Sequence, residues 1–275
     1  MAKAPEQPAL FDLSPQPRRL NDHGQRVVAW FSCGATSAIA TKLAIARWGD
    51  RVEVVRIRLG REHADNDRFA ADCSAWFGKP ILDIRSHRYD DHFEVAVGER
   101  YINGPDGAKC SAILKRAVRE AFQSFDDIQV FGFDADEEVS QNRARDFRLH
   151  HPEIMLVTPL LDEGLGKADC LAMVERAGIE IPAMYRLGFG NNNCVGCWKG
   201  GMGYWNKIRR DFPEVFAEAA LVERSIGRSA IRTKADGQVF LDTLDPARGR
   251  FEDEPKISCG PTCFTAESKI TGEAA

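Results

Sequence analysis

The sequence predicts an α/β protein with a doubly wound, mainly parallel β-sheet and a cysteine-rich C-terminal extension. Between residues 25 and 187, five short apolar runs of strand length alternate with longer segments that repeat apolar residues at helical spacing. This alternation is typical of parallel sheets covered by helices on both faces. From residue 188 the alternation stops, and Gly, Asn and Cys accumulate. We therefore expect an N-terminal arm over residues 1–24, an α/β domain over residues 25–187 and the extension over residues 188–275.

The individual elements follow from the apolar pattern in chain order. The predicted strands are residues 26–31, 52–59, 81–84, 129–133 and 154–157, each a short apolar run. The predicted helices are residues 36–48, 67–77, 109–125 and 166–177, the last of which is followed by Gly178, a residue type that commonly ends helices. Residues 204–224 have helical spacing with a break near Pro213. Because ligands of such sheets bind beyond the carboxyl ends of the strands, the residues after each strand are candidate site residues.

Composition and charge limit the location and partners of the protein. Its 275 residues carry a net charge of −4, which argues against a basic coat for nucleic acids but allows a local basic groove. No apolar run approaches the roughly 18 residues of a membrane span, and the Pro- and Gln-rich N-terminus has no apolar signal core. We therefore expect a cytoplasmic protein without membrane contact. There, the eight cysteines favour buried thiols, metal ligands or redox groups over disulfides.

A turn of small residues, Ser32-Cys33-Gly34-Ala35-Thr36-Ser37, joins the first predicted strand to the first helix. Its backbone can close around an anion, because the helix N-terminus presents unpaired N–H groups and a positive dipole. The hydroxyls of Ser32, Thr36 and Ser37 add donors. We expect the same dipole to lower the pKa of Cys33 and to make its thiol reactive. The alternative is a plain tight turn with a helix cap.

This turn resembles the fingerprint of the PP-loop superfamily of adenine-nucleotide hydrolase-like proteins, Ser-x-Gly-x-x-Ser, through Ser32, Gly34 and Ser37. The resemblance implies a PP-loop fold and an adenine nucleotide, either ATP or phosphoadenylyl sulfate (PAPS), bound by Ser32, Gly34, Thr36 and Ser37. Many ATP-using members carry an aspartate at the position of Thr36. Sulfonucleotide reductases in the superfamily also depart from that aspartate, which favours their branch.

Three cysteines have a spacing that indicates metal ligands. Cys194 and Cys197 form a Cys-x-x-Cys pair among Gly and Asn residues, and two thiolates so spaced can hold one metal. Cys110 opens a predicted helix 84 positions earlier, and Lys115 lies on the same helix. A zinc site, a redox pair, a chance pair and a buried helix cysteine are the alternatives.

The same arrangement resembles the [4Fe-4S] class of adenylyl-sulfate and PAPS reductases. Those enzymes carry Cys-Cys at such a helix start, a lysine a few residues on, and Cys-x-x-Cys at a comparable distance later. The resemblance implies a [4Fe-4S] cluster on Cys110, Cys194 and Cys197 and a catalytic role for Lys115. Lys109 replaces the first cysteine of the doublet, which would leave one iron open. An open iron is similar to that of PP-loop tRNA thiolases, which are thought to hold sulfide there.

The C-terminal tail carries a further cysteine pair, Cys259 and Cys263. Cys259-Gly260 resembles the reductases' C-terminal Glu-Cys-Gly-x-His, whose cysteine attacks the sulfate sulfur, and this implies a catalytic Cys259. Ser258 and Thr262 replace the glutamate and the histidine of that motif. A chance pair, a second metal site or a fourth cluster ligand is the alternative.

The segment after the fourth strand resembles the reductases' Gly-x-Arg-x-x-(Glu/Gln)-Ser motif with a later arginine, which cradles anionic groups of the nucleotide. Gly132 and Arg143 match, and we include Glu137 among the nucleotide-binding residues. Asp134 stands where an arginine is expected, and this reversed charge disfavours a bare sulfate or 3′-phosphate. A carboxylate there would instead hold Mg²⁺ with a triphosphate.

Basic and aromatic residues interleave from Trp198 to Arg210, with Tyr204 and Trp205 at the centre. Aromatic planes beside cations suit single-stranded nucleic acid. They also suit a small hydrophobic core around the cysteine pair, which is the interpretation that we favour.

Together these features predict a PAPS-reductase-like, nucleotide-binding enzyme of sulfur metabolism. Asp134 and the missing fourth cysteine favour sulfur transfer to a nucleic acid, or its thiolation, with ATP. The first alternative is a true sulfonucleotide reductase that releases sulfite through Cys259, and the second is a non-catalytic nucleotide sensor. The expected partners are the adenine nucleotide, a nucleic acid and a thiol-reductant or sulfur-donor protein, with a homodimer as one alternative for the oligomeric state.

Overall fold

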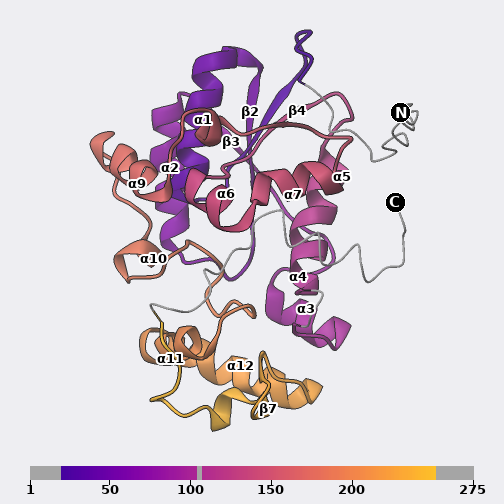
Figure 1. Ribbon diagram of the computed structural model, residues 1–275, viewed down its shortest axis with the longest axis vertical. Helices are drawn as coiled ribbons and strands as arrows, with labels where there is room; N and C mark the ends of the chain where they lie inside the picture. The colour runs from indigo at the N-terminus through magenta and orange to yellow at the C-terminus, as the bar shows by residue number, and fades with distance from the viewer. Residues whose placement is uncertain (1–19, 104–106, 252–275) are drawn as a thin grey trace, which may run out of the picture.

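The computed structural model describes residues 20–103 and 107–251. Its centre is a parallel sheet with the strand order β3-β2-β1-β4-β5 (Figure 1). The strands are β1 (Val27–Trp30), β2 (Val52–Ile57), β3 (Ile81–Ile84), β4 (Ile128–Val130) and β5 (Met155–Val157). All five predicted strands are present, and the parallel pairing confirms the predicted α/β class.

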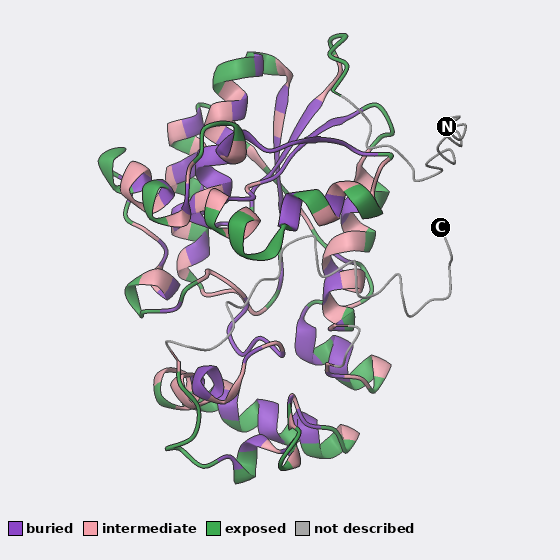
Figure 2. Cartoon of the chain, viewed as in Figure 1, coloured by how far each residue is buried: buried purple, intermediate pink, exposed green. Residues whose placement is uncertain are grey.

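Helices cover both faces of the sheet because successive strand residues point to opposite sides. Val27 and Ala29 pack in a core with α1 (Ala35–Trp48), α2 (Asp65–Phe77) and α9 (Lys167–Arg176). Val28 and Trp30 pack in a second core on the other face, with α7 (Arg143–His150). Figure 2 shows the central strands and the inward faces of these helices as buried, and every residue of β1, β4 and β5 is buried. The shorter helices α6 (Ala135–Gln141), α8 (Pro159–Asp162) and α10 (Ala183–Arg186) lie in the connections that follow β4 and β5.

The strand order places a crevice at the centre of the sheet. From β1 the chain moves outward to β2 and β3, and it then crosses back to β4 on the other side of β1. The connections that leave the carboxyl ends of β1 and β4 therefore diverge to opposite sides. In open α/β sheets this divergence opens the crevice in which ligands bind.

The helix predicted over residues 109–125 is interrupted. It consists of α4 (Lys109–Ser111), a π-helical turn over Ala112–Arg116, and α5 (Ala117–Phe122). Single π-helical turns inside α-helices are often found at functional sites. Lys115 lies within this turn.

The chain beyond residue 188 has a hydrophobic core of its own. This core is built from α11 (Met202–Asp211), α12 (Pro213–Ile226) and the hairpin of β6 (Ile231–Thr233) and β7 (Gly237–Val239). Helix α3 (His92–Glu99), which precedes α4 in the sequence, packs against it. The break near Pro213 is confirmed, whereas α3 and the hairpin were not predicted from the sequence.

The aromatic residues of this segment are buried. Trp198, Tyr204 and Trp205 are at most 2% exposed. The ring of Trp205 contacts the rings of Trp198 and Tyr204 within this C-terminal core. A base-stacking platform needs exposed rings, so the small-core interpretation is confirmed and the stacking interpretation is wrong. Within the described ranges, no helix is long and apolar enough to cross a membrane.

A buried carboxylate in this C-terminal core predicts a dependence of stability on pH. Glu223 is fully buried and accepts backbone N–H bonds from Ala230 (2.5 Å) and Leu241 (2.6 Å). Burial raises the pKa of Glu223 to about 7, although both hydrogen bonds oppose the shift. Because the folded-state pKa lies above the unfolded value, this group's stabilisation is complete below pH ~4.5 and is lost as the pH rises through about 7.

We therefore expect the free energy of unfolding to fall by about 2 kcal/mol between pH 5 and pH 8, measured by urea titration with circular dichroism. Glu223→Gln should remove this part of the pH dependence. Exposed Glu214 lies on the same helix, and Glu214→Gln is the control that should retain it. An unchanged slope in the Glu223 variant would contradict the assignment.

Candidate functional site

A pocket of about 180 Å³ opens at the carboxyl ends of β1, β2 and β4, at the position where the strand order reverses. The β1–α1 turn, residues 32–37, forms one wall through Ser32, Gly34, Thr36 and Ser37. The remaining lining comes from the strand ends, the α4–α5 helix and the segment after α10. The predicted nucleotide-binding residues that line the pocket are Ser32, Gly34, Thr36, Ser37, Gly132, Glu137 and Arg143, and predicted catalytic Lys115 lines it too.

The β1–α1 turn is held by its own hydroxyl groups. Ser37 Oγ accepts a hydrogen bond from the backbone N–H of Ser32 (3.1 Å) and donates one to the carbonyl oxygen of Gly34 (2.8 Å). Gly34 is the N-cap residue of α1 and has no side chain of its own to cap the helix. The first N–H groups of this fourteen-residue helix therefore face the pocket region with the positive end of its dipole. This geometry suits an anionic group.

Gly132 allows β4 to approach the first turn of α1. A Cβ atom on Gly132 would lie 2.8 Å from Ser37 N, 2.9 Å from Ser37 Cα and 2.9 Å from Thr36 C. All three are backbone atoms, which cannot move aside as a flexible side chain can. A glycine is therefore required here by close packing, and the floor of the pocket depends on it.

The pocket lining is positively charged. Among the described residues that line it are four cations, Lys115, Arg119, Arg143 and Lys167, and two carboxylates, Glu62 and Glu137. Each carboxylate is also paired with a buried arginine, Glu62 with Arg56 at 2.9 Å and Glu137 with Arg143 at 3.4 Å.

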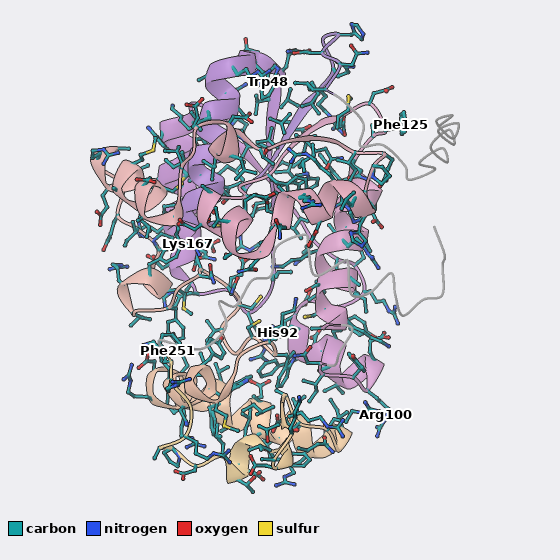
Figure 3. All side chains as sticks on the ribbon, in the orientation of Figure 1. Trp48, His92, Arg100, Phe125, Lys167 and Phe251 are labelled. Atoms are coloured by element: carbon teal, nitrogen blue, oxygen red, sulfur yellow. The ribbon has the colours of Figure 1, made fainter. Side chains whose placement is uncertain are left out.

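Two of these cations are unusually buried for arginine. Arg119 and Arg143 are each 3% exposed. Burial lowers the pKa of Arg119 to about 10, so its guanidinium is still charged at neutral pH. Because charged groups are costly to bury, cations at the wall of a cavity suit an anionic ligand. Lys167, the first residue of α9 (Figure 3), also donates to Asn191 Oδ1 (2.6 Å), which joins α9 to the segment after α10.

Several lining residues were not predicted from the sequence. They are Arg119, Lys167, Tyr185 and the asparagines 191–193. Arg119 lies four residues after Lys115 on the same helix, and this spacing could have revealed it. Tyr185 approaches the β1–α1 turn from α10, 150 residues away in the chain, and nothing in the local sequence indicates it. Burial raises the pKa of Tyr185 to about 12, so its hydroxyl keeps its proton.

The prediction for Cys33 is wrong. Cys33 has a left-handed backbone (φ 56°), and its side chain is fully buried in the core below β1 rather than in the pocket. Its Sγ atom lies 3.8 Å from the carbonyl oxygen of Asn66 on α2. Burial raises the pKa of the Cys33 thiol well above its usual value. The proximity of a helix N-terminus therefore does not make this thiol a nucleophile.

The prediction for Asp134 is also wrong. Asp134 is 1% exposed and does not line the pocket; it is the N-cap residue of α6 and accepts a hydrogen bond from Glu137 N (2.9 Å). One carboxylate oxygen caps the helix, and the other is buried without a hydrogen-bond partner among the described residues, so the carboxylate does not line the cavity in which Mg²⁺ and a triphosphate were expected. The reversed charge that argued against a sulfate-bearing nucleotide is therefore absent from the pocket wall.

The structure brings two of the three predicted metal ligands together. Cys194 lines the pocket and shares a small hydrophobic cluster with Cys110, although the two are 84 positions apart. Cys197 belongs to the C-terminal core, where its backbone N–H donates to Tyr204 Oη (2.9 Å). His92, the first residue of α3, lies between the central sheet and the C-terminal core (Figure 3). Its Nε2 atom is 2.9 Å from the carbonyl oxygen of Gly196.

Among residues 20–103 and 107–251, no three His, Cys, Asp or Glu side chains are grouped to hold a metal ion. The three-ligand site that the spacing indicated, and the [4Fe-4S] cluster that it would hold, stay predictions. Cys259 and Cys263 lie outside the described residues.

No model of a known protein family matches this sequence, and no curated protein is significantly similar to it. The resemblance to PP-loop proteins therefore depends on the motifs, and the functional assignment depends on the geometry of the pocket.

Proposed function

We propose that this chain is a PP-loop enzyme of the PAPS-reductase-like kind. It binds an adenine nucleotide in the pocket at the carboxyl ends of β1, β2 and β4 and uses the nucleotide in sulfur transfer. One observation carries the proposal. A helix-terminal turn, a positively charged lining and the residue Cys194 all belong to the same cavity.

The pocket lining matches both parts of a nucleotide. The β1–α1 turn and the four cations suit phosphate groups, which bind well to helix N-termini and to arginine. Apolar side chains at the ends of β1, β2 and β4 suit the flat faces of a base. These apolar lining residues are Trp30, Phe31, Val55, Ile57, Phe131 and Phe133.

With ATP, the supported reaction has two steps. An acceptor oxygen attacks the α-phosphorus, a new P–O bond forms, and pyrophosphate leaves. A sulfide-level sulfur donor then attacks the activated carbon, the C–O bond breaks, and AMP leaves with the oxygen. Neither step requires an oxidant. Cys194 is a cysteine in the pocket lining, where the donor must approach, and the cations stabilise the charge of the leaving groups.

The second candidate is sulfonucleotide reduction, and the position of Asp134 favours it. With Asp134 turned into the protein, the lining no longer repels a sulfate or a 3′-phosphate. A thiolate would attack the sulfur of PAPS, the S–O bond would break, and adenosine 3′,5′-bisphosphate would leave. A second thiol would then release sulfite and form a disulfide. Cys259, the predicted attacking thiol, lies outside the described residues.

Calorimetry and product analysis on the full chain test the proposal. We expect ATP, PAPS or both to bind at one site per chain and to compete with AMP. Conversion of ATP to AMP and pyrophosphate with sulfur incorporated into a nucleic acid would support thiolation. Sulfite released from PAPS in the presence of dithiothreitol would support reduction. Failure of all these nucleotides to bind would overturn both candidates.

A further inference from the structure

We propose that Asn192 is a positioning residue that couples the conformation of the β1–α1 turn to the position of the Cys194 thiol. This inference rests on the proposed function, because it assigns to the nucleotide-binding turn an effect on the sulfur atom at the same pocket. Asn192 is itself part of the pocket lining and lies two residues before Cys194.

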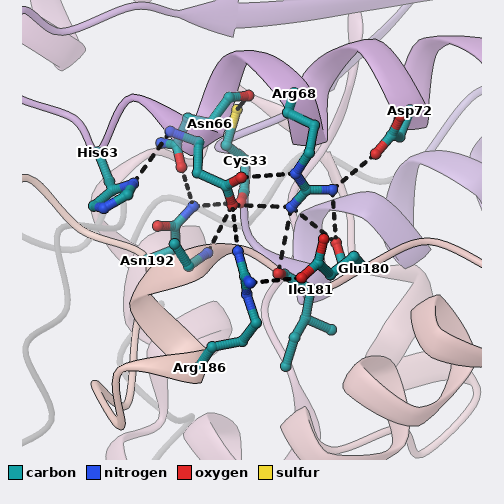
Figure 4. A network of polar contacts seen from close by, with 11 residues as sticks. Cys33, His63, Asn66, Arg68, Asp72, Glu180, Ile181, Arg186 and Asn192 are labelled. Carbon is teal, nitrogen blue, oxygen red and sulfur yellow. Dashed lines mark hydrogen bonds and ion pairs between the residues drawn. The ribbon is translucent and has the colours of Figure 1, made fainter.

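The side-chain amide of Asn192 donates two hydrogen bonds, one to the β1–α1 turn and one to α2. Nδ2 donates to the carbonyl oxygen of Cys33 (2.6 Å) and to Oδ1 of Asn66 (2.7 Å), as Figure 4 shows. Asn66 is 1% exposed and belongs to the first turn of α2. One side chain therefore joins the β1–α1 turn, α2 and the segment that leads to Cys194. These three parts are far apart in the sequence.

The bond to Cys33 acts on a strained point of the turn. Cys33 is one of only three non-glycine residues in the described chain with a positive φ. A non-glycine residue in this region is strained and persists only where its surroundings hold it. Asn192 supplies a hydrogen bond to the carbonyl group of this residue, at the start of the turn that presents the N–H groups of α1.

The segment that carries Asn192 is fixed on both sides. On the N-terminal side, the backbone N–H of Ala183 donates to Asp65 Oδ2 (2.8 Å), which anchors α10 to α2. On the C-terminal side, the backbone N–H of Val195 donates to the carbonyl oxygen of Arg61 (2.9 Å). Figure 4 shows two further contacts in this region. Arg68 on α2 donates to the carbonyl oxygens of Glu180 and Ile181, and Arg186 forms an ion pair with Glu180.

With both flanks held, a change in the turn reaches Cys194 mainly through Asn192. When a nucleotide fills the β1–α1 turn, the Cys33 carbonyl and the Asn192 amide adjust together, and Cys194 moves with them. The chemistry requires an amide at this position, because an aspartate of the same shape has no N–H to donate and would face two oxygen acceptors. Asn192→Asp therefore breaks the link and leaves the side-chain volume unchanged.

The experiment uses the full chain and two measurements. Calorimetry gives the Kd for ATP and for PAPS. Peptide mass spectrometry gives the rate at which iodoacetamide alkylates Cys194, with and without each nucleotide. The variants are Asn192→Asp, Asn192→Ala and Asn66→Ala, which removes only one of the two bonds.

Asn206→Asp is the matched control. Like Asn192, Asn206 donates two hydrogen bonds through Nδ2. Its acceptors are the backbone carbonyl oxygens of Asp245 (3.0 Å) and Arg248 (2.7 Å), at the edge of the C-terminal core. Thermal melts of all variants identify any that fail to fold.

In the parent chain, nucleotide should slow the alkylation of Cys194. In Asn192→Asp we expect about tenfold weaker nucleotide binding, about tenfold faster alkylation without nucleotide, and loss of the nucleotide effect on alkylation. Asn66→Ala should lie between parent and Asn192→Asp, and Asn206→Asp should match the parent.

Three results separate failure of this inference from failure of the proposed function. If the parent binds nucleotide and Asn192→Asp keeps both the parental Kd and the parental protection of Cys194, the coupling is overturned and the nucleotide site stands. If neither ATP nor PAPS binds the parent, the proposed function falls and this inference falls with it. If Asn192→Asp melts like the parent but binds weakly without any change at Cys194, the role of Asn192 is confined to binding and the coupling is overturned.

Discussion

Gly132→Ala is expected to lower the affinity for nucleotide by about 100-fold, the equivalent of 2–3 kcal/mol. The added methyl group would lie within 2.9 Å of backbone atoms of Thr36 and Ser37, so the first turn of α1 must shift. That turn supplies the N–H groups on which anion binding depends. Calorimetry with ATP and PAPS measures the loss, and a thermal melt shows how much of it accompanies destabilisation.

Gly190→Ala is the matched control for this substitution. Gly190 lies close to the pocket, but a Cβ atom there would meet nothing within 4 Å. Its backbone carbonyl, which accepts a bond from Lys167, is unchanged by the substitution. Parental affinity is expected in this control. If Gly132→Ala also bound nucleotide with parental affinity, the anion would have to bind elsewhere than at the turn.

Arg143→Gln is expected to weaken binding of a polyanionic nucleotide by about 100-fold. The variant removes a buried cation from the pocket wall and leaves the Glu137 carboxylate without the ion pair at 3.4 Å. Hydrogen bonds to charged groups contribute about 1.5–3 kcal/mol. In the variant, Arg143 no longer offsets the negative charge of Glu137, which then repels the anionic nucleotide. Calorimetry at several salt concentrations measures the effect, which should be larger for ATP and PAPS than for AMP.

The neighbouring Arg145 controls for a general loss of positive charge. Arg145 is on the same helix but is exposed and does not line the pocket. Arg145→Gln should change affinity less than twofold, because surface charges are screened by salt. Equal losses in the two variants would indicate a long-range charge effect in place of a pocket contact.

The sheet and its flanking helices could be predicted because apolar periodicity decides them. The strands between Val27 and Val157 are short apolar runs, and this pattern favours a strand over a helix. The turn after β1 could be recognised because small residues lie between a strand and a helix. Two missed elements carried signals that can be recognised. Asp91 caps α3 through Phe93 and Glu94, and Asp236-Gly237 is a common turn sequence between hairpin strands.

The two wrong site predictions have the same physical origin. Sequence gives the position of a residue along the chain but not the direction of its side chain. Cys33 follows a strand that ends at the pocket, yet its left-handed backbone turns the thiol into the core. Asp134 follows β4 in the same way, yet it caps α6. Its spacing to Glu137 matched a capping pattern and could have favoured that role.

The π-helical turn over Ala112–Arg116 changes how distances along this helix must be counted. In a regular α-helix, a residue five positions after another lies about 140° further round the axis. A π-helical turn bonds residues five apart and takes up one extra residue, so Lys115 comes round toward the face that carries Cys110, beside Cys194. Deleting one residue within the turn would restore a regular helix and rotate Lys115 and Arg119 relative to Cys110. A gap-free alignment of this helix with an uninterrupted one would therefore pair the wrong residues on one side of the turn.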